Sequence, residues 1–135
     1  MANALYDKGR EAFATGGINW TGDTIRAVLV DTGAYTVNLA THQFLSDIAA
    51  GARIATSAAL GSKTATAGVC DAADVTHPAV SGASVEAVVL IKDTGSAATS
   101  PLIAYIDTAT GLPVSPNGGD INIVWDNGAN KIFKL

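Results

Sequence analysis

The segment TIRAVLVD, residues 24–31, carries the strongest structural signal in the chain. Side chains alternate between the two faces of an extended strand, so the odd positions from Ile25 to Leu29 share one face and the even positions from Arg26 to Val30 share the other. Arg26 is the one charged side chain among these six positions. A strand that is apolar on both faces is typical of the middle of a covered sheet. We therefore predict a central strand here.

On the N-terminal side of this strand, the sequence predicts a helix over Ala2–Thr15. Asn3 is of a residue type that caps helix starts, and Gly16 and Gly17 are typical of a helix end. Gly9 lies in the middle of this helix, on its apolar face. There it either weakens the helix, by about 1 kcal/mol relative to Ala, or allows another backbone to approach closely.

On the C-terminal side, the sequence predicts one short helix at His42–Ala49, where apolar residues share one helix face. The segments after it have the pattern of strands: Arg53–Leu60, Lys63–Asp71, Val75–Val80, Glu86–Asp93, Leu102–Asp107, Ile121–Asp126 and Lys131–Leu135. Turn-forming residues separate these strands at a spacing of roughly 8–12 residues, which is typical of a sandwich or barrel. The last two strands flank Asp126-Asn127-Gly128, a preferred hairpin turn.

Together these elements predict a mainly β fold. We expect an antiparallel β-sandwich or barrel-like domain with an N-terminal helix and one short additional helix. Residues 1–17 are expected to form an N-terminal helix or arm, and residues 18–135 a single β-sandwich-type domain. A chain of 135 residues is long enough to bury such a core without disulfides or metals.

The composition predicts a surface with few charges. Charged residues make up 15% of the chain, against about 25% in typical soluble domains. Thr, Ser, Asn, Gly and Ala must therefore cover much of the surface, and we expect part of it to face other subunits. Eight scattered basic residues and a net charge of −4 form no basic stripe, so nucleic-acid binding is not expected. No apolar run approaches the ~20 residues that span a bilayer, so no membrane contact is expected.

Reactive residue types are few and widely spaced. His42 and His77 lie 35 positions apart and Cys70 is the single cysteine, so no ligand pair has zinc spacing and no metal or cofactor is predicted. A trio of His77, Ser84 and Asp74 could assemble in space, but any chain with two histidines and many serines allows such a trio. We predict no catalytic residues and no enzymatic activity.

Four aromatic residues are candidates for stacking on a sugar: Trp20, Tyr35, Tyr105 and Trp125. Trp125 is in phase with the apolar positions of its predicted strand, which indicates a core position. Trp20, just before the central strand, fits either a place under the N-terminal helix or a subunit contact. A pocket around Trp20 or Tyr105 would make the chain a carbohydrate-binding module, which is one alternative function.

Several segments together resemble a family of small bacteriophage virion proteins, and the resemblance covers nearly the whole chain. The segments are Leu5–Arg10, Gly17–Trp20, Ile25–Thr32, Tyr35–Asn38, Thr41–Leu45 and Gly118–Gly128. The resemblance lies in the overall pattern and includes no catalytic motif. It implies a structural component present in many copies per phage particle, on the head or the tail.

From this resemblance we expect a capsid decoration or cement protein that stabilises the head, made in the host cytoplasm and found in the virion. The expected partners are other virion proteins, chiefly the major capsid protein, and further copies of the chain, as a trimer. Expected interface residues are Tyr6, Arg10, Phe13 and Trp20, taken to lie outside the sandwich. Truncation of residues 1–17 should then leave a folded domain that no longer binds capsids. The alternative is a structural component of the tail, neck or baseplate.

Overall fold

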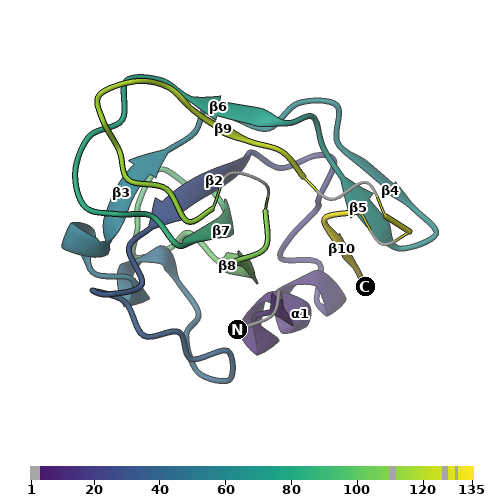
Figure 1. Ribbon diagram of the computed structural model, residues 1–135. Helices are drawn as coiled ribbons and strands as arrows, with labels where there is room; N and C mark the ends of the chain where they lie inside the picture. The colour runs from purple at the N-terminus through teal and green to yellow at the C-terminus, as the bar shows by residue number, and fades with distance from the viewer. Residues whose placement is uncertain (1–3, 110–111, 126–127, 130) are drawn as a thin grey trace.

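The computed structural model describes residues 4–109, 112–125, 128–129 and 131–135 (Figure 1). Its regular elements are β1 (Ala4–Leu5), α1 (Asp7–Ala14), β2 (Ile25–Val30), two 3-10 turns (Leu45–Asp47 and Ala50–Ala52), β3 (Arg53–Thr56), β4 (Thr64–Thr66), β5 (Val69–Asp71), β6 (Val75–His77), β7 (Ala87–Lys92), β8 (Leu102–Ile106), β9 (Ile121–Ile123) and β10 (Phe133–Lys134). The strands of these residues form three antiparallel sheets. The predicted mainly β, antiparallel fold is confirmed.

The largest sheet has five strands in the order β1-β8-β7-β2-β3. β2 and β7 form its longest pairing, from Ile25 opposite Lys92 to Val30 opposite Ala87. The three middle strands consist almost wholly of buried apolar residues. They can be buried because a neighbouring strand on each side satisfies their backbone N–H and C=O groups.

Each face of this sheet has its own apolar core. On one face, Ile25 and Leu29 of β2 belong to a cluster shared with residues of β5, β9 and β10. On the other face, Val28 and Val30 pack in a second cluster with apolar residues of the segment 31–52. The prediction of a central strand covered on both sides is therefore confirmed.

Two smaller sheets lie over the first of these faces (Figure 1). One has three strands in the order β10-β5-β4, and the other pairs β6 with β9. Cys70 of β5, Ile123 of β9 and Phe133 of β10 are buried in the cluster that they share with the large sheet. The arrangement is sandwich-like, with a second layer split into two pieces.

The N-terminal helix is shorter than predicted and begins later. α1 spans Asp7–Ala14, whereas Ala4–Leu5 forms β1 and pairs with β8 at the edge of the large sheet. The backbone N–H of Tyr6 also donates to the carbonyl of Ile103 at 3.0 Å, so the chain stays extended up to the start of α1. The predicted cap, Asn3, lies outside the described residues.

Gly9 allows a close approach between α1 and the large sheet. A Cβ added at this position would lie 2.7 Å from the carbonyl oxygen of Leu102 and 3.0 Å from that of Ile103. Both are backbone atoms of β8 and cannot move aside without disturbing the sheet. Of the two roles predicted for Gly9, the close approach of another backbone is the one found.

The short helical stretch predicted at His42–Ala49 is not an α-helix and is shorter than predicted. The segment instead contains the 3-10 turn Leu45–Asp47. The Asp47 carboxylate accepts the backbone N–H groups of Gln43 and Phe44 at 2.7 and 3.0 Å. Leu45 and Ser46 donate their backbone N–H groups to carbonyls of the segment 97–100. The N–H groups of Leu45 and Ser46, which an α-helix beginning at His42 would use internally, are therefore occupied by another segment.

Two strand predictions also need correction. The segment Lys63–Asp71 is a hairpin of β4 and β5, because Ala67 and Gly68 both have positive φ, 54° and 79°. The predicted hairpin of the last two strands is wrong, since β9 pairs with β6 and β10 pairs with β5. Its expected turn residues Asp126 and Asn127 lie outside the described residues.

Candidate partner interface

The four predicted interface residues divide into two pairs. Tyr6 has no exposed surface and Trp20 is 4% exposed, so neither contacts a partner in this conformation. Arg10 is exposed on α1, with 59% of its side chain accessible. Phe13 is half-buried, with its ring centroid 6.0 Å from that of Phe133. The structure therefore buries Trp20 in the cluster between the sheets and Tyr6 in the cluster on the other face of the large sheet, which corrects their assignment to the outside, and leaves Arg10 at the surface.

Tyr6 begins a chain of hydrogen bonds that ends near the surface. Its hydroxyl lies 2.9 Å from the Tyr35 hydroxyl, which lies 2.7 Å from Nδ1 of His42. The backbone N–H of Asn38 also points at this nitrogen, at 3.3 Å, so Nδ1 is the acceptor and each tyrosine hydroxyl donates along the chain. Burial raises the pKa of both tyrosines. The chain ties the N-terminal segment to the segment 31–52.

The two tryptophans bind the segment 71–74, which connects β5 to β6. The Trp20 indole N–H donates to the carbonyl of Asp71 at 3.1 Å, and the Trp125 indole N–H to that of Ala73 at 3.0 Å. The backbone N–H of Trp125 donates to the Asp74 carboxylate at 2.9 Å. Each ring is buried and has its polar atom satisfied, which is the usual arrangement for a structural tryptophan.

The residues that could do chemistry have separate partners. Cys70 is buried, and burial raises the pKa of its thiol to about 11, so it stays protonated at neutral pH. His77 is 1% exposed, and its Nε2 lies 3.0 Å from the carbonyl of Ala27. Ser84 hydrogen-bonds Glu86, while Asp74 accepts the N–H described above. The structure therefore does not assemble His77, Ser84 and Asp74 into a hydrogen-bonded trio.

The described part of the chain contains neither a metal-binding cluster nor a membrane-spanning helix. Within it, no group of three or more His, Cys, Asp or Glu residues is placed to hold a metal ion. None of its helices is long and apolar enough to cross a membrane. Tyr35 and Tyr105, two of the aromatic candidates for a sugar platform, are each 5% exposed, so their rings are not presented to a ligand.

The exposed charges of α1 pair with each other. Arg10 lies 3.7 Å from the Asp7 carboxylate and Lys8 lies 3.3 Å from that of Glu11. Solvent-exposed pairs of this kind contribute about 0–1 kcal/mol, so a partner can separate them at little loss. The exposed face of α1 therefore offers both signs of charge to a complementary surface.

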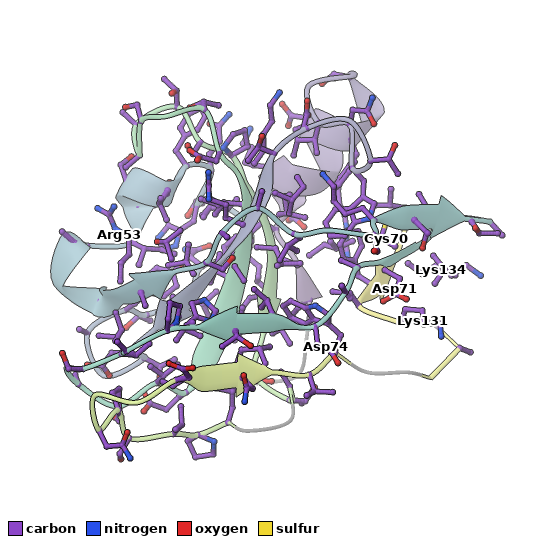
Figure 2. All side chains as sticks on the ribbon, turned by 90° about the horizontal axis from the view of Figure 1, so that it is seen from above. Arg53, Cys70, Asp71, Asp74, Lys131 and Lys134 are labelled. Carbon is purple, nitrogen blue, oxygen red and sulfur yellow. The ribbon has the colours of Figure 1, made fainter. Side chains whose placement is uncertain are left out.

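Charged residues also lie at both ends of the molecule seen in Figure 2. Figure 2 shows Arg53 at the end of the molecule opposite Cys70, Asp71 and Lys134, which lie together on β5 and β10. Arg53 is occupied internally, since its Nε donates to the carbonyl of Ile48 at 3.0 Å.

The most exposed regular element was not singled out from the sequence. Thr64, Ala65 and Thr66 of β4 are all exposed, and β4 forms the outer edge of its sheet. In Figure 1 the β4–β5 hairpin projects from the body of the molecule. Gly68 was the available signal, because a glycine inside a strand pattern often marks a turn.

No protein-family model matches this chain, and no curated protein is detectably similar to it.

Proposed function

We propose that this chain is a non-enzymatic structural subunit of a phage particle, and that it binds the outside of the capsid as a decoration or cement protein. The observation that carries the proposal is the way the reactive residue types are used. Cys70 and His77 are buried in the domain, and both tryptophan indoles bind main-chain carbonyls. These side chains stabilise the fold, as is expected of a protein whose task is to hold a shape and contact neighbours.

The surface supports the same proposal. Charged residues are 15% of the chain, and the exposed strand β4 carries only Thr and Ala. Low charge allows close packing against other subunits, because few charges must be desolvated. We place the chain in the virion, against the major capsid protein, as a homo-oligomer that is a trimer at local symmetry points of the shell.

The exposed face of α1 is the proposed capsid contact, centred on Arg10 with the half-buried Phe13 beside it. Each copy would contribute a modest contact, and repetition over many copies would stabilise the shell. Truncating residues 1–17 is no longer a clean test, since β1, Tyr6 and Gly9 pack on the large sheet. Point substitutions on the helix surface replace it.

The test is an add-back experiment with particles that lack this chain. Such particles should lose their DNA at a lower temperature than complete ones, and the purified chain should restore the difference. Arg10→Glu should fail to restore it, while Lys134→Glu, the same charge change at an exposed site on β10, should succeed. Equal restoration by both variants would show that α1 is not the contact.

Copy number separates the head from the tail. Hundreds of copies per particle are expected for a decoration protein, because each capsid subunit or symmetry point offers a site. About six to eighteen copies would instead indicate a ring or adaptor of the neck, tail or baseplate, and would contradict the decoration role. Absence of the chain from purified particles would contradict the structural role altogether.

A further inference from the structure

Among the residues that the structure describes, β4 has one edge without a neighbouring strand. It stands last in the order β10-β5-β4, on the outer side of the projecting hairpin (Figure 1), and all three of its residues are exposed. A strand edge presents a row of N–H and C=O groups that another extended chain satisfies in full. The edge therefore fits a β-strand as its partner.

The ladder identifies which backbone groups face outward. The carbonyl of Cys70 accepts the N–H of Ile132 at 3.2 Å, so the backbone of Cys70 faces β10. Ala65 lies directly opposite Cys70. In an antiparallel pair, two directly opposite residues either both point their backbone N–H and C=O groups toward each other or both point them away. The N–H and carbonyl of Ala65 therefore face away from β5, toward the free edge.

We propose that β4 pairs with β4 of a second copy of this chain, antiparallel and about a twofold axis at Ala65. The two Ala65 residues then exchange a pair of N–H···O=C hydrogen bonds. Thr64 of each copy lies opposite Thr66 of the other, and threonine pairs are favourable cross-strand neighbours. The sequence Thr-Ala-Thr is the same in both directions, so a twofold axis gives both copies equivalent contacts.

The charges around this edge favour a second copy as the occupant. β4 carries no charged side chain, so two copies meet without like-charge repulsion. The adjacent Lys63 donates its ammonium to the carbonyl of Asp23, which holds the cation against its own chain. The strand also lacks the charges and prolines with which edge strands commonly avoid self-pairing. A three-residue contact is small, so the free chain should associate weakly. The inference concerns the free chain and does not rest on the proposed function.

A charge-swap experiment tests the pairing at Ala65. In sedimentation velocity from roughly 10 µM to about 1 mM, the unaltered full-length chain should form dimers as its concentration rises. Ala65→Lys and Ala65→Glu should each remain monomers, because two like charges face each other across the axis. An equimolar mixture of the two variants should form dimers again. A mixture no more associated than either variant alone would overturn the proposal.

The same charge changes at Thr56 provide the matched control. Thr56 is also exposed and belongs to β3, one of the two edge strands of the large sheet. Thr56→Lys should dimerise as the unaltered chain does. If it abolishes dimerisation as strongly as Ala65→Lys, general charge repulsion explains the loss and the proposal fails.

A disulfide trap gives an independent readout that tolerates weak association. Directly opposite, hydrogen-bonded residues of an antiparallel pair have Cα atoms about 5.5 Å apart, within the range of a disulfide. Under mild oxidation, Ala65→Cys should form a covalent dimer faster than Thr56→Cys. Equal rates for the two variants would overturn the proposed register even if the charged variants failed to fold.

Discussion

The β2–β7–β8 region and the β4–β5 hairpin are both antiparallel, yet they differ in what covers them. Almost all residues of the three middle strands are buried, on both faces of the sheet, whereas every residue of β4 is exposed. Both regions satisfy their internal ladders, so hydrogen bonding alone does not distinguish them. Buried apolar surface does, at about 25 cal/mol per Å². We therefore expect most of the stability of the domain to come from the large sheet, whereas the edge of the β4–β5 hairpin is available to contact another chain.

The largest expected effect is a cavity in the large sheet. Leu90 of β7 has no exposed surface, and Leu90→Ala should lower the free energy of unfolding by about 2–5 kcal/mol. Thr66→Ala on β4 should change it by less than about 0.5 kcal/mol. Urea denaturation measures both. Similar losses for the two variants would remove the proposed division between the regions.

A second prediction concerns the seat of α1 on β8. Gly9→Ala places a Cβ 2.7 Å from the carbonyl of Leu102, and overpacking of this kind destabilises by about 1–3 kcal/mol. Helix propensity alone predicts the opposite, a gain of about 1 kcal/mol. Gly51→Ala is the control, because nothing lies within 4 Å of its added Cβ. A melting temperature raised by Gly9→Ala would contradict the close approach.

A third prediction is a pH dependence that arises in the core. Burial lowers the pKa of His77, so the folded state favours neutral imidazole. The contribution of neutral His77 to the free energy of unfolding is complete above the pKa of about 6.5 that the residue has in the unfolded chain. This contribution declines as the pH falls from there toward the lower pKa of the folded state. The slope of the free energy of unfolding against pH in this range corresponds to the uptake of at most one proton.

The variant His77→Gln keeps an amide donor for the Ala27 carbonyl and does not titrate. Denaturant titrations between about pH 6.5 and 4.5 should therefore show a flatter dependence for this variant than for the unaltered chain. An identical dependence would show that His77 is not held neutral by the fold.

The smallest expected effect lies at the hairpin turn. Ala67 has a φ of 54°, a conformation that costs about 1–2 kcal/mol for most L-residues. Asn tolerates it, and Asn-Gly is the preferred pair for this turn, so Ala67→Asn should stabilise the chain by a fraction of that amount. Ala65→Asn, in the adjacent extended strand, should not. Thermal denaturation compares the two, and a loss of stability at position 67 would contradict the turn geometry.

The sequence predicted the large sheet well because side-chain alternation needs only residue type. The run from Ile25 to Val30 is apolar at nearly every position, and burial on both faces follows directly. Turns were harder. Alanine rarely adopts the positive φ that Ala67 has here. The β4–β5 hairpin was therefore predicted as one strand, and its free edge was missed with it.

Tertiary contacts explain the other differences. The helical stretch predicted at His42–Ala49 is reduced to one 3-10 turn because carbonyls of the segment 97–100, distant in sequence, accept the N–H groups of Leu45 and Ser46. Tyr6 was expected at the surface, but its hydroxyl finds Tyr35, 29 positions away. No local pattern records such partners. The exposed position of Arg10 was predictable because it lies on the polar side of α1.

Amide hydrogen exchange of the free chain, followed residue by residue by NMR, compares the two regions most directly. The amides of Val88, Val89 and Leu90 should exchange only on global unfolding. At low concentration the amide of Ala65 should exchange close to its intrinsic rate, and raising the concentration should slow it. An Ala65 amide as protected as those of β7 in dilute solution would contradict the account.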